Sequence, residues 1–365
     1  MASSHRLGSV RTKHMGAGVI ALVTSTALIL TGCSSSGDDA KDKDKESTTT
    51  TSAAESSEAE SSSADSTAAA SSTITIKDTE GEQEVKLPVE RVAVTDNRAF
   101  AVLDEWGVDL VAAPKGLISP NIKRYKENDD ILDVGMHFEP NLENLVAAKP
   151  DLIINGQRFA KQYDEIKKLN PDTPVVQFNA TKKDVDFVET IRDQVLALGK
   201  IFNKDSDAEA MVKEFDDAVE KAKKAYDGEK TVMAVIVAGG KIIYINPGNG
   251  RTLGPLYELL GLKPALEVEG ASAGAHGDDI SVEALAEANP DILLVMDRDA
   301  PLNSAKKPEY VPAKKAIEES DALQNVNAVK NGAIYYAPTD TYLNESVPLY
   351  IDMLNGMADT FKAAK

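Results

Sequence analysis

Short apolar runs alternate with helix-like segments from about residue 92 to the end of the chain. Two of these runs, residues 151–154 and 174–178, are brief and almost continuously apolar. Runs of this kind are typical of parallel strands that helices cover on both faces. Further upstream, residues 73–76 and 84–87 read as strands on either side of a turn at Gly81, which predicts a hairpin. The pattern as a whole predicts an α/β fold built on mostly parallel sheets.

One segment of the chain occurs twice. Residues 141–154 are repeated without a gap as residues 281–294. In each copy a polar residue, Asn141 or Ser281, is placed to cap a short helix, a proline stops that helix, and a buried strand follows. The repeat therefore predicts two similar α/β lobes rather than one large sheet.

The segment between the two copies predicts how the lobes are joined. Apolar residues recur at helical spacing from Asp184 to Leu198, so one long helix is expected to connect the lobes. We expect an N-terminal lobe over residues 73–182, the connecting helix over 183–203 and a C-terminal lobe over 204–365. A ligand cleft is expected between the lobes, which a helical link allows to open only slightly.

The beginning of the chain has the features of an export signal. A basic start precedes the apolar run 18–30, which is short for a membrane-spanning helix. The stretch Leu30-Thr-Gly-Cys33 then resembles the bacterial lipobox, whose cysteine carries the lipid. Residues 34–72 are almost all small, polar or acidic, which predicts a disordered tether. We therefore expect a signal peptide over residues 1–33 and a lipid anchor at Cys33, on the extracytoplasmic face of the cell membrane.

Charge and composition exclude several classes of protein. The chain has 40 Lys and Arg residues against 59 Asp and Glu residues, a formal net charge of −19. A nucleic-acid binder needs a basic face, so this class is excluded. The single cysteine excludes an intrachain disulfide and a cysteine-based zinc cluster. Only His137 and His276 lie in the expected folded part, which disfavours a site for a bare metal ion.

Cationic residues follow several of the expected strands. Arg158, Arg251 and Arg298 each come soon after an apolar run, and strand carboxyl ends form the usual crevice of open α/β sheets. Arginine keeps its charge and fork geometry when it is desolvated. These residues therefore indicate a site for an anionic ligand, with Lys115 and Arg98 as weaker candidates. The alternative is that each is a surface arginine paired with a local acid.

A series of short stretches has a characteristic order and spacing. The stretches are Trp106-Gly-Val, Ala113-Pro-Lys-Gly116, Glu139-Pro-Asn-Leu-Glu143, Asn155-Gly-Gln-Arg158, Ala275-His276-Gly277, Val295-Met-Asp-Arg298 and Tyr335 to Tyr342. Together they resemble the substrate-binding proteins of ABC importers for iron-siderophores and cobalamin, in particular the catechol-type siderophore binders. The resemblance extends from about residue 73 to residue 365.

The resemblance implies a function. It implies a receptor, expected to be a monomer and not an enzyme, that binds a ferric catecholate or mixed-catecholate siderophore and delivers it to an ABC permease for iron uptake. The siderophore is the transported ligand, and no permanent cofactor is implied. His276 and Tyr342 would complete the iron coordination of a tetradentate siderophore, and Glu143 and Glu283 would dock onto the permease.

Other interpretations stay open at this point. His276 and Tyr342 could be pocket-lining or loop residues, and Glu143 and Glu283 could serve only the dipoles of their helices. The same fold could bind haem or cobalamin, although an aromatic content of 5% is low for such a pocket. A tethered siderophore hydrolase is a more distant alternative, because the chain has no nucleophile elbow, HExxH sequence, P-loop or dinucleotide fingerprint.

Overall fold

The structure is a computed structural model that describes residues 72–268, 277–278 and 280–365. The described residues all belong to one compact unit. The expected signal peptide, the lipidation site Cys33, the expected tether up to residue 71 and the candidate ligand His276 lie outside the described residues. None of the helices in the described part of the chain is long and apolar enough to cross a membrane.

The hairpin expected near the start of the folded part is confirmed. Strands β1 (Ser72–Asp78) and β2 (Gly81–Leu87) pair antiparallel. In the turn between them, Gly81 has a backbone φ of 131°, a conformation that residues other than glycine rarely adopt. Thr79 donates its backbone N–H to the carbonyl of Gln177, which ties the hairpin to the first sheet.

The first sheet has five parallel strands in the order β5-β4-β3-β8-β9. They are β3 (Val92–Val94), β4 (Leu110–Ala113), β5 (Leu132–Asp133), β8 (Leu152–Asn155) and β9 (Val175–Gln177). The connections contain α1 (Ala99–Glu105), η1 (Lys115–Leu117), α2 (Lys123–Lys126), β6 (Gly135–Met136), β7 (Glu139–Pro140), α3 (Leu142–Ala147), η2 (Gln157–Gln162) and α4 (Tyr163–Leu169). Every residue of β3, β8 and β9 is buried, as expected for strands of this type.

The second sheet has the order β11-β10-β13-β14, with β12 also paired to β10. Its strands are β10 (Thr231–Ala238), β11 (Lys241–Ile245), β12 (Lys263–Pro264), β13 (Ile292–Asp297) and β14 (Ile334–Tyr336). The helices of this half are α7 (Pro255–Leu260), α8 (Val282–Glu287), η3 (Asn303–Lys306), α9 (Ala313–Glu318) and α10 (Asn327–Lys330). All pairings are parallel except that of β11 with β10. The expected fold class, α/β with mostly parallel sheets, is confirmed.

The sequence repeat corresponds to the same structure in both halves. Asn141 and Ser281 each cap a helix by accepting a backbone N–H with the side-chain oxygen. The aspartate just before the next strand then accepts a backbone N–H at the beginning of the neighbouring strand. Asp151 accepts from the backbone N–H of Arg91, just before β3, and Asp291 accepts from that of Thr231, the first residue of β10. This bond fixes the register of two adjacent parallel strands, which explains why the aspartate occurs in both copies.

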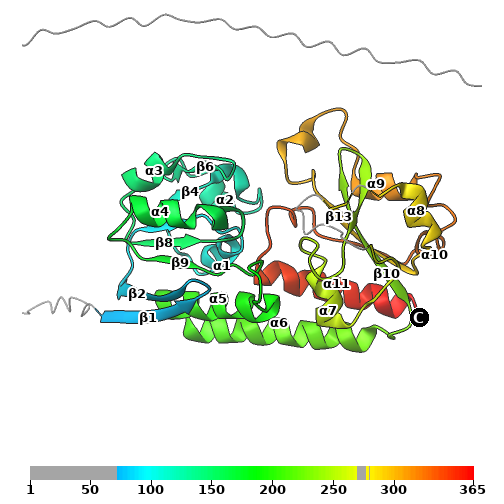
Figure 1. Ribbon diagram of the computed structural model, residues 1–365, viewed down its shortest axis with the longest axis horizontal. Coiled ribbons are helices and arrows are strands. Elements are labelled where there is room, and N and C mark those ends of the chain that lie inside the picture. The colour runs from blue at the N-terminus through cyan, green and yellow to red at the C-terminus, as the bar shows by residue number, and fades with distance from the viewer. Residues whose placement is uncertain (1–71, 269–276, 279) are drawn as a thin grey trace, which may run out of the picture. The chain divides into compact units, whose positions relative to one another are not determined.

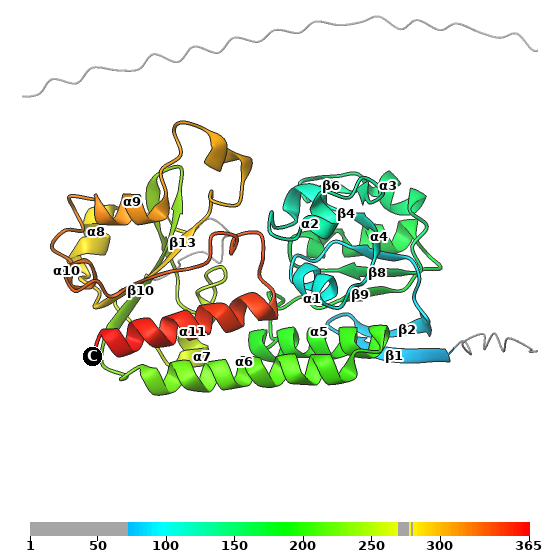
Figure 2. The ribbon, with the colours of Figure 1, turned by 180° about the vertical axis from the view of Figure 1, so that it is seen from behind.

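Three longer helices form a layer of their own. They are α5 (Phe187–Phe202), α6 (Asp205–Ala225) and α11 (Val347–Ala363), which lie side by side in Figures 1 and 2. Helix α5 lies within the segment expected to connect the lobes, and the longer α6 follows it directly. Helix α11 contacts α1 of the first half and β14 of the second.

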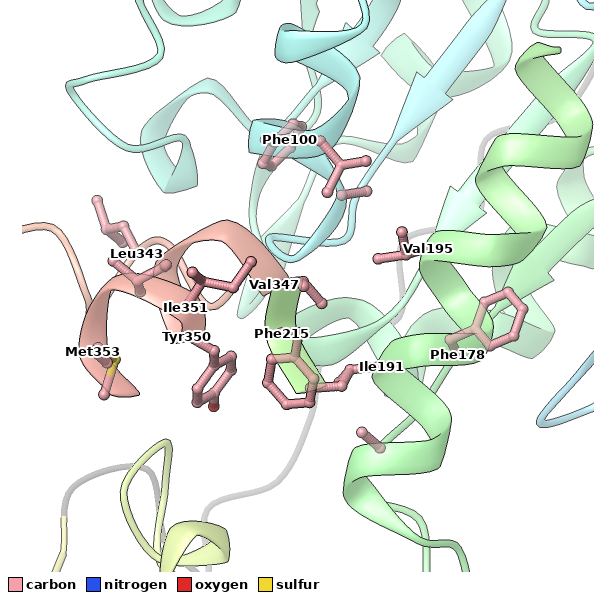
Figure 3. Close-up of a cluster of buried hydrophobic side chains, with 14 of the residues drawn as sticks. Phe100, Phe178, Ile191, Val195, Phe215, Leu343, Val347, Tyr350, Ile351 and Met353 are labelled. Carbon is pink, nitrogen blue, oxygen red and sulfur yellow. The ribbon is translucent and has the colours of Figure 1, made fainter. Parts of the chain in front are cut away.

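The helical layer shares its hydrophobic core with both sheets. Figure 3 shows Ile191 of α5, Phe215 of α6 and Tyr350 of α11 directed toward one another. The same buried cluster continues to Val92 of β3 and to Val232 of β10. Because one continuous core joins the two halves through packed helices, large movements between the sheets would expose apolar surface.

Candidate functional site

Three arginine side chains surround one aromatic ring. The guanidinium carbons of Arg158, Arg251 and Arg298 lie 4.7, 4.4 and 5.3 Å from the centroid of the Tyr342 ring. At these distances each cation is attracted by the face of the ring. Tyr342 itself is only 5% exposed. The structure therefore brings together four of the residues that the sequence analysis singled out, and they come from both halves of the fold.

Arg158 is positioned by the sharp turn at the carboxyl end of β8. The turn needs Gly156, because a Cβ atom there would lie 2.3 Å from Oδ2 of Asp96. Arg158 then donates from Nη2 to the main-chain oxygen of Tyr342 at 2.8 Å. Its buried Nε has no hydrogen-bond partner among the described residues. One donor of this guanidinium is therefore unsatisfied in this arrangement of the side chains.

Arg298 follows β13, at the carboxyl end of a central parallel strand. Its backbone N–H donates to the carbonyl of Val237 at 2.9 Å, which extends the sheet by one residue. The side chain donates from Nη1 to Asp299 at 2.9 Å. Arg298 thus has the local acid partner that the alternative interpretation required, and it still lies against Tyr342.

Arg251 reaches the site by a different route from the one expected. We expected it to follow a strand whose carboxyl end shares the crevice edge, but β11 runs antiparallel to β10. Its carboxyl end therefore does not lie at the edge formed by the ends of β13 and β14, and that expectation is wrong. The loop 246–254 carries Arg251 to the cluster, where Nη2 donates to the main-chain oxygen of Tyr342 at 3.1 Å.

The loop that carries Tyr342 is attached to the first half of the fold, although it follows β14 of the second. Asn97 donates to the carbonyl of Leu343 at 2.7 Å, and Ser119 donates to Asp340 at 2.8 Å. With the bond from Arg158 to Tyr342, these contacts hold the loop across the two halves. The position of the ring is therefore fixed by residues distant in sequence.

A buried carboxylate lies on the inner side of the cluster. Glu345 is 2% exposed, and its Oε1 accepts from Nε of Arg251 at 3.1 Å. It also accepts from the hydroxyl of Thr252 and the amide of Gln157. Glu345 is not among the residues that the sequence predicts for the site. The only signal was its place just before Ser346, the N-cap of α11, and that position does not distinguish a buried acid from an exposed one.

The charges of the cluster act on one another. Burial raises the pKa of Tyr342, but Arg158, Arg251 and Arg298 outweigh it and leave that pKa below its ordinary value. Burial raises the pKa of Glu345 as well, and the nearby arginines again leave it lowered. Burial, with Arg251 nearby, lowers the pKa of Arg158. The site therefore favours the anionic form of an aromatic hydroxyl group. It would favour the anionic form of a phenolic ligand for the same reason.

The two weaker cationic candidates lie in different places. Arg98 is buried behind the cluster, 5.8 Å from the centroid of the Phe187 ring, and it lowers the pKa of Glu345. Lys115 instead donates to the carbonyl of Asn128 at 2.7 Å. It also pairs with the fully exposed Asp129. The ammonium group of Lys115 thus has its partners within the connection between β4 and β5, whereas Arg98 contributes to the electrostatics of the site.

The two predicted docking residues occupy equivalent and exposed positions. Glu143 lies in the first turn of α3 and Glu283 in the first turn of α8, each with its side chain in solvent.

His137 lies elsewhere, and its carbonyl accepts from Gln162. Within the described ranges, no three His, Cys, Asp or Glu residues gather as they would around a bare metal ion.

Known proteins resemble this chain in sequence and in structure. FatB, the ferric-anguibactin-binding protein of Vibrio anguillarum, is 31% identical over 274 residues, which cover 73% of this chain and 80% of FatB. YclQ, the petrobactin-binding protein of Bacillus subtilis, is 28% identical over 268 residues, covering 73% of this chain and 79% of YclQ. The crystal structure of VctP, the periplasmic catecholate-siderophore binding protein of Vibrio cholerae, superposes with a TM-score of 0.67. VctP is 28% identical to this chain, and the superposition covers 80% of this chain and all of the VctP chain.

A family model gives the classification. The model described as "Periplasmic binding protein" matches residues 92–341, from β3 of the first sheet to the loop that carries Tyr342. It thus spans both sheets and the arginine residues around that ring. The relatives and the fold agree with this match, and the resemblance proposed from the sequence is confirmed. The chain belongs to the periplasmic binding protein family.

Proposed function

We propose that this protein is an extracytoplasmic receptor that binds a ferric siderophore of catecholate or mixed-catecholate type and delivers it to the permease of an ABC importer. The observation that carries the proposal is the convergence of Arg158, Arg251 and Arg298 on one aromatic ring, that of Tyr342. This arrangement offers cationic and aromatic contacts at one point.

The chemistry of a ferric catecholate matches such a site. Each catecholate is an aromatic ring with two anionic oxygens, and the complex carries a charge of about −1 with two such groups or about −3 with three. Arginine stays charged when desolvated, donates to anionic oxygens in a fork and stacks on aromatic faces. The lowered pKa of Tyr342 supports the idea that the site stabilises aromatic oxyanions.

The relatives support the same class of ligand. FatB and YclQ are named for binding ferric anguibactin and petrobactin, and VctP for binding catecholate siderophores. All three are named as binding proteins, which supports a receptor rather than an enzyme. We infer that this chain binds its cargo without chemical turnover.

Tyr342 takes a second role in this proposal. When the siderophore fills only four iron positions, the Tyr342 oxygen and the imidazole of His276 would complete the coordination. His276 lies outside the described residues, but the segment directly after it is fixed, because Asp278 exchanges two backbone hydrogen bonds with Tyr244 of β11. A hexadentate siderophore would leave both residues without a metal contact.

Delivery needs a membrane location and a permease contact. We propose that a lipid on Cys33 holds the protein at the cell membrane, as the lipobox-like sequence indicates. We further propose that Glu143 and Glu283 form an exposed acidic pair, one from each half, that binds basic residues of the permease. This proposal is supported by their equivalent positions, because each glutamate lies in the first turn of its helix in one copy of the repeat.

Fluorescence offers a direct test of ligand binding, since Trp106 is the only tryptophan. Ferric complexes of a catecholate, a carboxylate and a hydroxamate siderophore are titrated into the protein, with calorimetry in parallel. The proposal predicts saturable quenching by the catecholate at the lowest concentration. Equal or stronger binding of the hydroxamate, or no signal with any of the three, would contradict it.

A further inference from the structure

The carboxylate of Glu345 is buried among positive charges that a ligand would face. It accepts hydrogen bonds from Arg251, Thr252 and Gln157, and Arg98 and Arg158 also favour its charged form. Arg251 and Glu345 are both shielded from solvent, with side chains 9% and 2% exposed. Solvent therefore screens this negative charge little, and a ligand in the site is exposed to it.

Pairing with acids reduces the positive charge of the cluster unevenly. Arg251 is paired with Glu345, and Arg298 is paired with Asp299. Arg158 donates to a neutral carbonyl, and no acid pairs with it in the described part of the chain. The ligand therefore meets a smaller net positive charge than three arginines alone would present.

We propose that Glu345 is a specificity-determining residue, whose buried negative charge limits the anionic charge of the ferric complex that the site accepts. This inference rests on the proposed function. It assigns Glu345 a role beyond fixing Arg251, because the carboxylate repels each further negative charge on the ligand. The repulsion increases with ligand charge, whereas a purely structural role affects all ligands of the site alike.

The test compares two synthetic probes that differ in charge. One is the ferric complex of a hexadentate tris-catecholamide, with a charge of about −3, and the other that of a tetradentate bis-catecholamide, with a charge of about −1. Both dissociation constants are measured by calorimetry for the parent protein and for Glu345→Gln. Because the same two probes are compared between proteins, every contribution that is the same in the parent and in Glu345→Gln cancels. The Kd ratio of the two probes is the quantity of interest.

Loss of the Glu345 charge is expected to shift that ratio about tenfold in favour of the more anionic probe, because one charge in a poorly screened site acts on two extra ligand charges. The matched control is Glu318→Gln, which removes an exposed acid that pairs with Lys314 on α9. This control should shift the ratio by less than twofold. Raising the salt concentration should reduce the effect in Glu345→Gln only slightly, since the group is buried.

Arg98→Gln provides a second and opposite variant, so the inference does not depend on the folding of Glu345→Gln alone. Removing this buried positive charge should shift the ratio toward the less anionic probe. Equal changes in both dissociation constants in Glu345→Gln, or an unchanged ratio in Arg98→Gln, would overturn the role of Glu345. A parent protein that binds neither probe would instead contradict the proposed function itself, and the inference with it.

Discussion

Arg158 and Arg251 donate hydrogen bonds to the same atom, the main-chain oxygen of Tyr342, at 2.8 and 3.1 Å. Arg158 comes from the first half of the fold and Arg251 from the second. The guanidinium groups would repel each other, and the shared carbonyl, the Tyr342 ring and Glu345 offset this repulsion. The loop before α11 therefore assembles the cationic site, in addition to carrying one of its residues.

Arg158 should contribute most to ligand binding among the three arginines, because it is the one without an acid partner among the described residues. Arg158→Ala is expected to cost about 1–3 kcal/mol of binding free energy for a ferric catecholate. Calorimetric titration measures the change. The control is Arg124→Ala, which removes an arginine paired with Asp109 at the surface and should leave the affinity within twofold. If Arg158→Ala binds as the parent does, the ligand lies elsewhere.

Arg251 should matter for stability as well as for binding. Arg251→Met leaves the buried Glu345 carboxylate without its ion-pair partner, and breaking such a pair costs about 3 kcal/mol of unfolding free energy. Urea unfolding measures this loss. The matched control, Arg192→Met, breaks the more exposed pair with Asp216 and should cost less than about 1 kcal/mol. Equal losses in the two variants would show that Glu345 is not held as an anion.

Tyr342 should ionise at lower pH than most other tyrosines of the protein. The neighbouring arginines leave its pKa lowered, whereas burial raises the pKa of Tyr125, Tyr244 and Tyr310, among others. A folded-state pKa below the unfolded value of about 10 means that Tyr342 contributes stability that is present above that pH. This contribution is lost as the pH falls through the lowered folded value.

An absorbance titration of phenolate formation tests this ionisation. The parent protein should show a component below pH 10 that is missing in Tyr342→Phe. Tyr335→Phe, which removes a tyrosine whose pKa is raised by burial, serves as the control and should keep that component. Identical titration curves for the parent and Tyr342→Phe would mean that the arginines do not stabilise the phenolate.

Glu143 and Glu283 should serve delivery rather than capture. The double variant with alanine at both positions is expected to keep its siderophore affinity within about twofold, since both side chains are exposed on α3 and α8. Uptake of iron through the cognate permease should fall sharply, and arginine at both positions should be worse, because like charges would then meet. Uptake is measured with radioactive iron in cells that depend on this receptor.

The control for the docking pair replaces exposed acids on the same two halves. Glu105→Ala with Glu287→Ala removes the same amount of charge at exposed positions where α1 and α8 end, rather than in the first turn of a helix. This double variant should transport iron normally. Normal transport by the double alanine variant of Glu143 and Glu283 would contradict the docking role. The two glutamates would then only interact favourably with the dipoles of their helices.

Much of the fold could be predicted from local patterns. The capped helix, the proline and the aspartate of residues 141–154 predicted a short helix and a buried strand, and the structure has both in each copy. The direction of β11 was missed, although Gly239 and Gly240 stand before it with φ of 56° and 74°. Adjacent glycines between two strands are a hairpin signal, so this information was present in the sequence.

The site was predictable only in part. Arg158 and Arg298 follow central parallel strands, so their approach could be inferred from the chain. Glu345 could not be found in this way, because its partners Arg251 and Gln157 lie 94 and 188 positions away. No local pattern records contacts over such separations. The burial of one acid among several arginines is a property of the folded chain alone.

Anomalous scattering can locate the iron of a bound siderophore in the protein. Crystals grown with the ferric complex of a bis-catecholamide are measured near the iron absorption edge, and an anomalous difference map is calculated. We expect one strong iron peak beside Tyr342, with catecholate oxygens within hydrogen-bond distance of Arg158, Arg251 and Arg298. An iron peak elsewhere on the protein, with these three arginines still closed around Tyr342 alone, would contradict this expectation.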